Sequence, residues 1–205
     1  MYYNTVIIAD GTFPTHEIPL EYIRNAGRII CCDGSAGATI NSGFEPAAIV
    51  GDMDSLDDEL LSKYSDRIYT DKNQETNDLT KAVQWCYGKG YSDIVIVGAT
   101  GKREDHTIGN ISLLAEYCTY ADVIMITDNG IFRPYLKSSD IKSYPGQQIS
   151  IFSIDPDTTI TSRGLLYPLE ETKLKNWWCG TLNESVKDVF SLHFDRGRII
   201  VYMKF

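Results

Sequence analysis

Two carboxylates stand two positions apart in the stretch Gly51-Asp52-Met53-Asp54-Ser55. An apolar run at 47–50 precedes them and is typical of a buried strand. Hard cations such as Mg²⁺ prefer oxygen ligands, and one or two carboxylates together with substrate phosphates are enough to bind them. Burying two like charges this close together without a cation is costly. The motif therefore predicts a divalent-cation site, and the alternative is a solvated acidic turn.

Further polar clusters follow the other apolar runs in the first two-thirds of the chain. Asp10 and Asp33 each come directly after one run, and the segments 71–78 and 98–106 follow two others. Ligands bind outside the carboxyl ends of the strands in an open α/β sheet, so these clusters should converge on one edge. The last cluster carries Lys102 and Arg103 in a loop that contains glycine. Carboxylates for metal beside cations for phosphate oxygens indicate a magnesium–nucleotide site.

Each member of these clusters also has a structural explanation. Asp33 is suited to cap a following helix, and Asp78 suits the first turn of one because its charge complements the helix dipole. Arg103 and Asp105 could be a surface pair, and His106 could be a packed or helix-starting histidine. Neither G-x-x-x-x-G-K-[ST] nor G-x-G-x-x-G occurs, so a phosphate site has to be built from these loops.

The elements that must position these residues alternate between strands and helices. Strands are predicted at 5–9, 28–32, 47–50, 67–69, 94–97 and 123–126, and helices near 20–26, 34–42, 57–63, 76–88 and 106–118. This alternation predicts an α/β fold, in which an N-terminal, Rossmann-like domain has a parallel sheet covered on both faces.

The pattern changes after about residue 130. Gly, Pro, Asp and Ser punctuate short alternating runs at 148–153, 158–163 and 189–194. The turn residues 195–197 separate the last of these runs from another at 198–202, which predicts a hairpin. The second domain is therefore expected to be a small antiparallel β-sandwich. The predicted domains span residues 1–135 and 140–205.

Composition limits the class of protein. The chain has 205 residues and a formal net charge of −9, with 28 acidic against 19 basic residues, which argues against a nucleic-acid partner. The five cysteines are odd in number and form no C-x-x-C pair, which favours a reduced setting. No apolar run approaches a membrane span, and the N-terminus lacks signal-peptide regions. We therefore expect a cytoplasmic protein without a membrane partner.

Several segments together resemble the motifs of the thiamine pyrophosphokinase family in order and spacing. They are D-G-S-A at 33–36, G-D-M-D-S at 51–55, N-Q-E-T-N-D-L-T-K at 73–81, G-K-R-E-D-H at 101–106 followed by Asn110, G-L-L-Y-P-L at 164–169 and G-T-L-N-E at 180–184. The resemblance covers nearly the whole chain. It implies a homodimer that transfers the pyrophosphoryl group of ATP to the hydroxyethyl oxygen of thiamine, giving thiamine diphosphate and AMP. It also implies that 1–135 binds ATP and Mg²⁺ and that 140–205 binds thiamine and dimerises.

The resemblance assigns roles to individual residues. The implied Mg²⁺ ligands are Asp52, Asp54 and Asp78. Arg103 is implied on phosphate, and Asp105 near the metal or the thiamine hydroxyl, where it is a candidate base with His106 as the alternative. The other residues expected to bind substrate are Asp33, Gln74, Asn77, Lys102, His106 and Asn183, with Gln74 on the nucleotide and Asn183 on thiamine.

The chain departs from the family pattern at two places. The loop often written G-G-R is Gly101-Lys102-Arg103 here, so Lys102 adds a phosphate contact or points to solvent. The motif usually written S-N-E is Leu182-Asn183-Glu184, which removes the serine hydroxyl. Trp177 or Trp178 could stack on the cationic thiazolium or serve as a core or interface residue.

Two other functions compete with this interpretation. One is a diphosphokinase that acts on another hydroxyalkyl heterocycle such as a pterin, which the motifs of the second domain disfavour. The other is a non-catalytic regulator that binds nucleotide or thiamine, which the three intact metal-site carboxylates disfavour.

Overall fold

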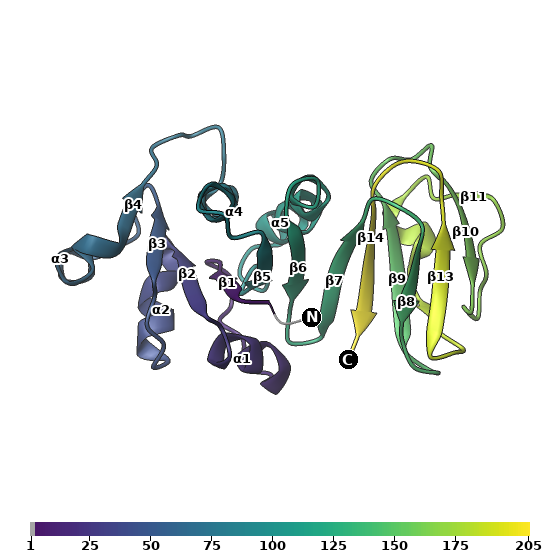
Figure 1. The fold of residues 1–205 in the computed structure, drawn as a ribbon, viewed down its shortest axis with the longest axis horizontal. Helices are drawn as coiled ribbons and strands as arrows, with labels where there is room; N and C mark the ends of the chain where they lie inside the picture. The colour runs from purple at the N-terminus through teal and green to yellow at the C-terminus, as the bar shows by residue number, and fades with distance from the viewer. Residues whose placement is uncertain (1–2) are drawn as a thin grey trace. The chain divides into compact units, whose positions relative to one another are not determined.

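The computed structural model describes residues 3–205, and the chain divides into two compact units. The first unit extends to Leu113 and includes Tyr120–Asp128, whereas the second consists of Leu114–Thr119 and Asn129–Phe205. Figure 1 shows the helices and strands of the first unit and the strands of the second. The fold is mixed α/β with a separate antiparallel sheet. Within residues 3–205, no helix is long and apolar enough to cross a membrane.

Parallel strands in the spatial order β6, β5, β1, β2, β3, β4 form the sheet of the first unit. These strands are β1 (Thr5–Ile8), β2 (Arg28–Cys32), β3 (Ala48–Gly51), β4 (Ile68–Thr70), β5 (Asp93–Val97) and β6 (Asp122–Ile126). Almost every residue of β1, β2, β3 and β5 is buried, which is the pattern of strands covered on both faces. Each strand predicted in this region is confirmed to within one residue at either end.

Helices alternate with these strands. They are α1 (Glu17–Arg24), η1 (Asp33–Ser35), α2 (Ala36–Asn41), α3 (Asp58–Lys63), η2 (Ser65–Arg67), α4 (Asp78–Gly88) and α5 (Glu104–Tyr117). Helix α1 begins before its predicted start because the His16 side chain accepts from the Ile18 amide and Pro19 fits the first turn. Helix α4 begins where Asn77 accepts from the Thr80 amide at 2.8 Å. The starts of α1 and α4 therefore fix where the loops after β1 and β4 end.

Two antiparallel sheets form the second unit. One has the order β12 (Asn183–Glu184), β9 (Gln148–Ser153), β14 (Ile199–Lys204), β7 (Gly130–Tyr135), and the other β11 (Thr172–Lys173), β10 (Thr159–Arg163), β13 (Val189–His193), β8 (Ser139–Lys142). A short 3₁₀ turn, η3 (Trp177–Gly180), precedes β12. Both sheets contribute to one core that includes Ile151, Ile160, Phe190 and Val201. The two sheets therefore sandwich this core. This unit includes β7, which pairs with β14, and the predicted domain ranges 1–135 and 140–205 stay a prediction.

The hairpin predicted around residues 195–197 is wrong. Strand β13 pairs with β8 and β10, whereas β14 pairs with β7 and β9, so the connection crosses from one sheet to the other. Gly197 has a φ of +91°, and the Asp155 carboxylate accepts from the Arg198 backbone amide at 2.9 Å. The Arg198 guanidinium also donates to Asp155 at 3.2 Å. These contacts stabilise an arch that connects the two sheets. The residue types of the turn do not distinguish such an arch from a hairpin.

Candidate active site

Three carboxylates gather at the ends of β2 and β3. One oxygen each from Asp33, Asp52 and Asp54 lies within 4.8 Å of the others. Met53 adopts a left-handed backbone with φ of 71°, and its amide donates to Asp33 Oδ2 at 2.9 Å. A side chain at Gly51 would place its Cβ 2.6 Å from the Asp33 carboxyl carbon, so glycine lets Asp33 approach this strand. Neighbouring parallel strands thus bring the two loops together.

The electrostatics of this group suit a bound cation. Asp33 is only 2 % exposed. Burial, reinforced by the charges of Asp78 and Asp52, raises the Asp33 pKa to about 6, although two backbone amides oppose the shift. A hydrogen bond from the Asp54 amide and another from Gln74 lower the Asp52 pKa. An oxygen-only donor set with a buried acid that resists ionisation fits a hard divalent cation, since the cation stabilises the ionised form.

Asp78 lies outside this group of three. It is the first residue of α4, and its Oδ1 accepts from Lys81 Nζ at 2.9 Å. The Lys81 side chain is only 3 % exposed. Burial works against its charge, yet the hydrogen bond and charge of Asp78, with Asp52 and Asp71, leave its pKa raised. The predicted ligand set named Asp78, whereas the geometry groups Asp33 with the other two carboxylates. Direct ligation by Asp78 stays a prediction.

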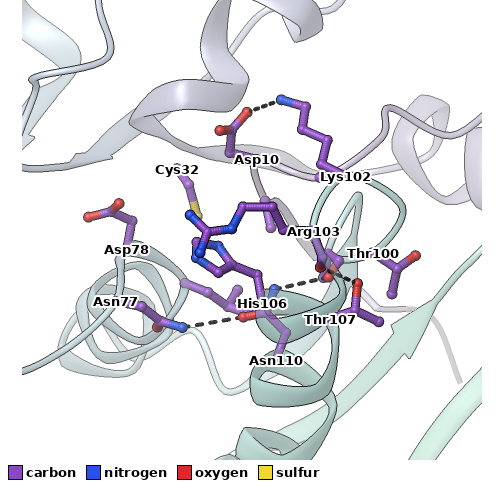
Figure 2. A pocket seen from close by; sticks show the side chains of 14 residues that line it. Asp10, Cys32, Asn77, Asp78, Thr100, Lys102, Arg103, His106, Thr107 and Asn110 are labelled. Carbon is purple, nitrogen blue, oxygen red and sulfur yellow. Dashed lines mark hydrogen bonds and ion pairs between the residues drawn. The ribbon is translucent and has the colours of Figure 1, made fainter.

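A cavity of about 330 Å³ opens in the first unit, and its lining includes Asp78 and Cys32, which directly precedes Asp33. It is formed by the loops after β1 and β5 and by the N-terminal turns of α4 and α5. Its lining includes Asp10, Cys32, Asn77, Asp78, Thr100, Lys102, Arg103, His106, Thr107 and Asn110. Figure 2 shows Lys102 beside Asp10 at one side, and Asp78 and Asn77 at another. The cavity therefore brings together the predicted residues Asn77, Asp78, Lys102, Arg103 and His106.

Arg103 is held by its neighbour Asp105. The guanidinium donates through Nε at 3.1 Å and through Nη2 at 2.6 Å. The His106 amide also donates to Asp105 at 2.9 Å. The hydrogen bond from Arg103, followed by that amide, lowers the Asp105 pKa to about 2. A carboxylate with so low a pKa is a weak proton acceptor, which favours Asp105 as the residue that orients Arg103 over its role as base.

Two other predicted residues make contacts of different kinds. The Gln74 side-chain amide lies 3.4 Å from Asp52 Oδ2, beside the carboxylate group. Asn77 caps α4 and also donates to Asn110 Oδ1 at 3.3 Å, and Asn110 in turn donates to the Ala99 carbonyl at 2.9 Å. Asn77 thus ties α4 to α5, a structural role that its spacing in the sequence did not indicate.

Asn183 belongs to the second unit, where it is buried. Its Oδ1 accepts from the Tyr167 and Glu184 amides at 3.1 and 2.9 Å, and its Nδ2 donates to the Tyr167 carbonyl at 2.7 Å. The side chain therefore clamps the segment around Tyr167 to β12. Contact with thiamine stays a prediction for this residue. The clamp leaves Leu166, Tyr167 and Leu182 exposed on the surface.

Asp10 lines the cavity although it was not among the predicted site residues. Asp10 follows β1 and accepts from Lys102 Nζ at 2.6 Å. The sequence feature that could have identified Asp10 was its position directly after a predicted strand. A carboxylate group and a cavity with two cations, both at the carboxyl ends of parallel strands, suit the binding of metal-complexed phosphates.

Comparisons with known proteins identify the family. Residues 20–139 match the model described as thiamin pyrophosphokinase, catalytic domain, and residues 130–202 match thiamin pyrophosphokinase, substrate-binding domain. The chain belongs to the thiamin pyrophosphokinase family.

Individual relatives agree with this assignment. The chain is 27 % identical over 199 residues to thiamine pyrophosphokinase 1 of Oryza sativa subsp. japonica, covering 82 % of this chain and 75 % of that protein. A crystal structure of a thiamin pyrophosphokinase family protein from Enterococcus faecalis has a TM-score of 0.82 at 20 % identity, covering 98 % of this chain and 99 % of that one. The thiamine pyrophosphokinase structure from Bacillus subtilis has a TM-score of 0.79 at 22 % identity, covering 98 % of each chain. At such identities the structures establish the fold.

Proposed function

We propose that the protein transfers the pyrophosphoryl group of ATP to the hydroxyethyl oxygen of thiamine, giving thiamine diphosphate and AMP. One observation carries this proposal within the family. The carboxylate group lies after β2 and β3, and the cavity with Lys102 and Arg103 lies after β1 and β5, so both are built at the carboxyl ends of neighbouring strands in one parallel sheet. Such an edge of a parallel sheet suits a nucleotide whose phosphates meet cations and whose metal meets carboxylates.

The proposed metal is Mg²⁺. Asp33, Asp52 and Asp54 would hold it, with Asp78 as a further candidate. When bound, the ion supplies charge neutralisation for the triphosphate. Asp33 supports this assignment because its buried carboxyl has a raised pKa of about 6 and lies beside Asp52 and Asp54.

The remaining cavity residues would bind and orient the substrates. Arg103, steadied by Asp105, and Lys102 offer donors to phosphate oxygens. Gln74 extends the polar surface beside Asp52 toward the nucleotide. Transfer to an alcohol also requires a group that takes the hydroxyl proton. We assign this role to His106, which lines the cavity, because Asp105 is a weak base.

We further propose that the protein acts as a homodimer in the cytoplasm. The second unit exposes Tyr167, Trp178 and Leu182, which are 63 %, 74 % and 85 % exposed. Large apolar side chains exposed together are typical of interaction sites. A second copy would cover them, and thiamine would lie between the β-sandwich of one subunit and the acidic loops of the other.

The test is an assay of the purified protein with ATP, Mg²⁺ and thiamine, in which chromatography resolves AMP from ADP. We expect AMP and thiamine diphosphate in equal amounts. Asp54→Asn should lower turnover by roughly a hundredfold or more, because a neutral amide replaces a charged metal ligand. Asp58→Asn is the matched control, since Asp58 is exposed nearby and outside the group of three carboxylates.

The alternatives have distinct outcomes. ADP with thiamine monophosphate would contradict pyrophosphoryl transfer. Turnover of a pterin alcohol in preference to thiamine would change the substrate, and nucleotide binding without any turnover would indicate a regulator. Equal turnover in Asp54→Asn and Asp58→Asn would remove the metal role from Asp54.

A further inference from the structure

The loop that carries Lys102 is fastened to the loop after β1. The Gly11 amide donates to the Gly98 carbonyl at 2.6 Å, and the Thr12 amide donates to the Thr100 carbonyl at 2.8 Å. A Cβ at Gly11 would lie 2.4 Å from both Gly98 O and Thr100 O, so only glycine allows this approach. The backbone around Lys102 is therefore fixed, and its long side chain is the part that is free to move.

Asp10 sits at the start of the opposite loop and holds the Lys102 ammonium. Lys102 Nζ lies 2.6 Å from Asp10 Oδ1, and the two side chains are 55 % and 49 % exposed. Asp10 rests against the Gly34 backbone, where a Cβ would come within 2.7 Å of the Asp10 carboxyl carbon. The carboxylate is thus confined while the lysine is flexible. Exposed ion pairs of this kind are weak, so a more highly charged anion can replace Asp10 as the partner.

The charged side chains that line the cavity each already have a partner of opposite charge. Arg103 is bound by Asp105 through two hydrogen bonds, and Asp78 is bound by the buried Lys81. An entering polyphosphate therefore gains most from a cation that can leave its partner. Lys102 meets this requirement because a single contact on a flexible stem holds it, whereas the guanidinium of Arg103 is fixed by two.

We propose that Asp10 holds Lys102 in a parked position and that the polyphosphate of the bound nucleotide takes Lys102 from Asp10. The inference rests on the proposed use of ATP and adds a specific competition between a carboxylate of the protein and the ligand. It explains what the lysine does at a position where the family often has glycine. Lys102 then acts as a binding residue, and Asp10 opposes binding.

The proposal predicts effects of opposite sign for the two partners. Lys102→Met removes a phosphate contact and should weaken MgATP binding by about tenfold, as expected for a charge-assisted hydrogen bond. Asp10→Asn keeps the shape of the side chain against Gly34 but removes its charge. It should tighten MgATP binding by about threefold, since an exposed ion pair no longer has to be broken. A role limited to fastening the loops predicts that both substitutions weaken binding.

Titration calorimetry measures these affinities, with MgATP and with inorganic tripolyphosphate as probes. Lys63→Met is the matched control for loss of one positive charge, because Lys63 lies in the last turn of α3 outside the cavity lining. Melting temperatures verify that each variant is folded. In the Lys102→Met background, Asp10→Asn should tighten binding by much less than it does in the wild-type protein. The difference between the two effects measures the coupling of the pair.

The outcomes separate this inference from the proposed function. Opposite signs, with Lys63→Met unchanged, support the parked lysine. A wild-type protein that binds MgATP and turns over thiamine, but whose Asp10→Asn variant binds more weakly, overturns the inference alone. Unchanged binding in Lys102→Met overturns it as well. A folded wild-type protein that binds neither probe overturns both the inference and the proposed function.

Discussion

The net charge of the carboxylate group near neutral pH depends on whether Asp33 is ionised. Its carboxyl is buried, yet it receives hydrogen bonds from the Gly34 and Met53 amides at 2.7 and 2.9 Å. Burial and the nearby Asp78 and Asp52 charges outweigh these bonds and raise its pKa from 3.8 to about 6. At neutral pH without metal, the folded protein therefore carries an unfavourable negative charge at this position.

This shift predicts a pH-dependent effect of Mg²⁺ on stability. Between about pH 4 and pH 6 the folded protein retains a proton on Asp33 that the unfolded chain has released. That contribution to stability is present at low pH and is lost as pH rises through 6, where Mg²⁺ can replace the proton. We expect Mg²⁺ to raise the melting temperature clearly at pH 8 and little at pH 5, measured by circular dichroism. An equal Mg²⁺ shift at both values, or none at pH 8, would contradict this account.

At the scale of elements, the end of β3 lies in close contact with the start of η1. Gly51 closes β3 where Asp33 opens η1, and the missing side chain lets them approach. Gly51→Ala would place a Cβ 2.6 Å from the Asp33 carboxyl carbon and displace that carboxyl. We expect the variant to fold but to lose the Mg²⁺ effect on melting temperature. Gly88→Ala is the control, because nothing lies within 4 Å of a Cβ there. A normal Mg²⁺ effect in Gly51→Ala would show that Asp33 need not stay in place.

The elements also show what sequence patterns can and cannot predict. The apolar runs of β1, β2 and β5 were predictable because strands buried on both faces have continuous hydrophobic patterns. The polar clusters could be placed from the sequence as well, because they follow the ends of these strands and parallel strands share one ligand-binding edge. The choice between Asp33 and Asp78 in the carboxylate group was not predictable, because it depends on which strands are neighbours. The prediction of a hairpin between β13 and β14 was wrong for the same reason, because strand pairing depends on contacts between distant parts of the chain.

At the scale of the whole molecule, Leu182 is the residue that bears most directly on the proposed homodimer. It has a φ of 60°, which is unfavourable for leucine, and it is 85 % exposed. The left-handed backbone costs stability at a leucine, and a side chain this exposed recovers little of that cost by packing within the chain. This is consistent with the proposal that a second copy covers the exposed apolar side chains of the second unit.

Leu182→Asn tests that proposal without damaging the subunit, because asparagine adopts left-handed backbone at lower cost. We expect the subunit to remain folded and the dimer dissociation constant to rise by about tenfold, the effect of losing about 1.4 kcal/mol. Activity should then fall on dilution. Analytical ultracentrifugation measures the association, with Leu136→Asn as the control at another exposed leucine of this unit. A wild-type protein that is a fully active monomer at micromolar concentration would count against the interface.

The position of β14 has a consequence for the order in which the molecule is made. Strand β14 lies between β7 and β9, so the middle of one sheet is supplied by residues 199–204. During synthesis, β7 and β9 emerge from the ribosome without the strand that joins them. The parallel strands of the first unit, by contrast, are all present once β6 ends at Ile126. The first unit can therefore fold while the chain is still growing, whereas the sandwich must wait for its last strand. A chain that stops before residue 199 would have a gap in the centre of a sheet, leaving two strand edges open to pairing with other molecules.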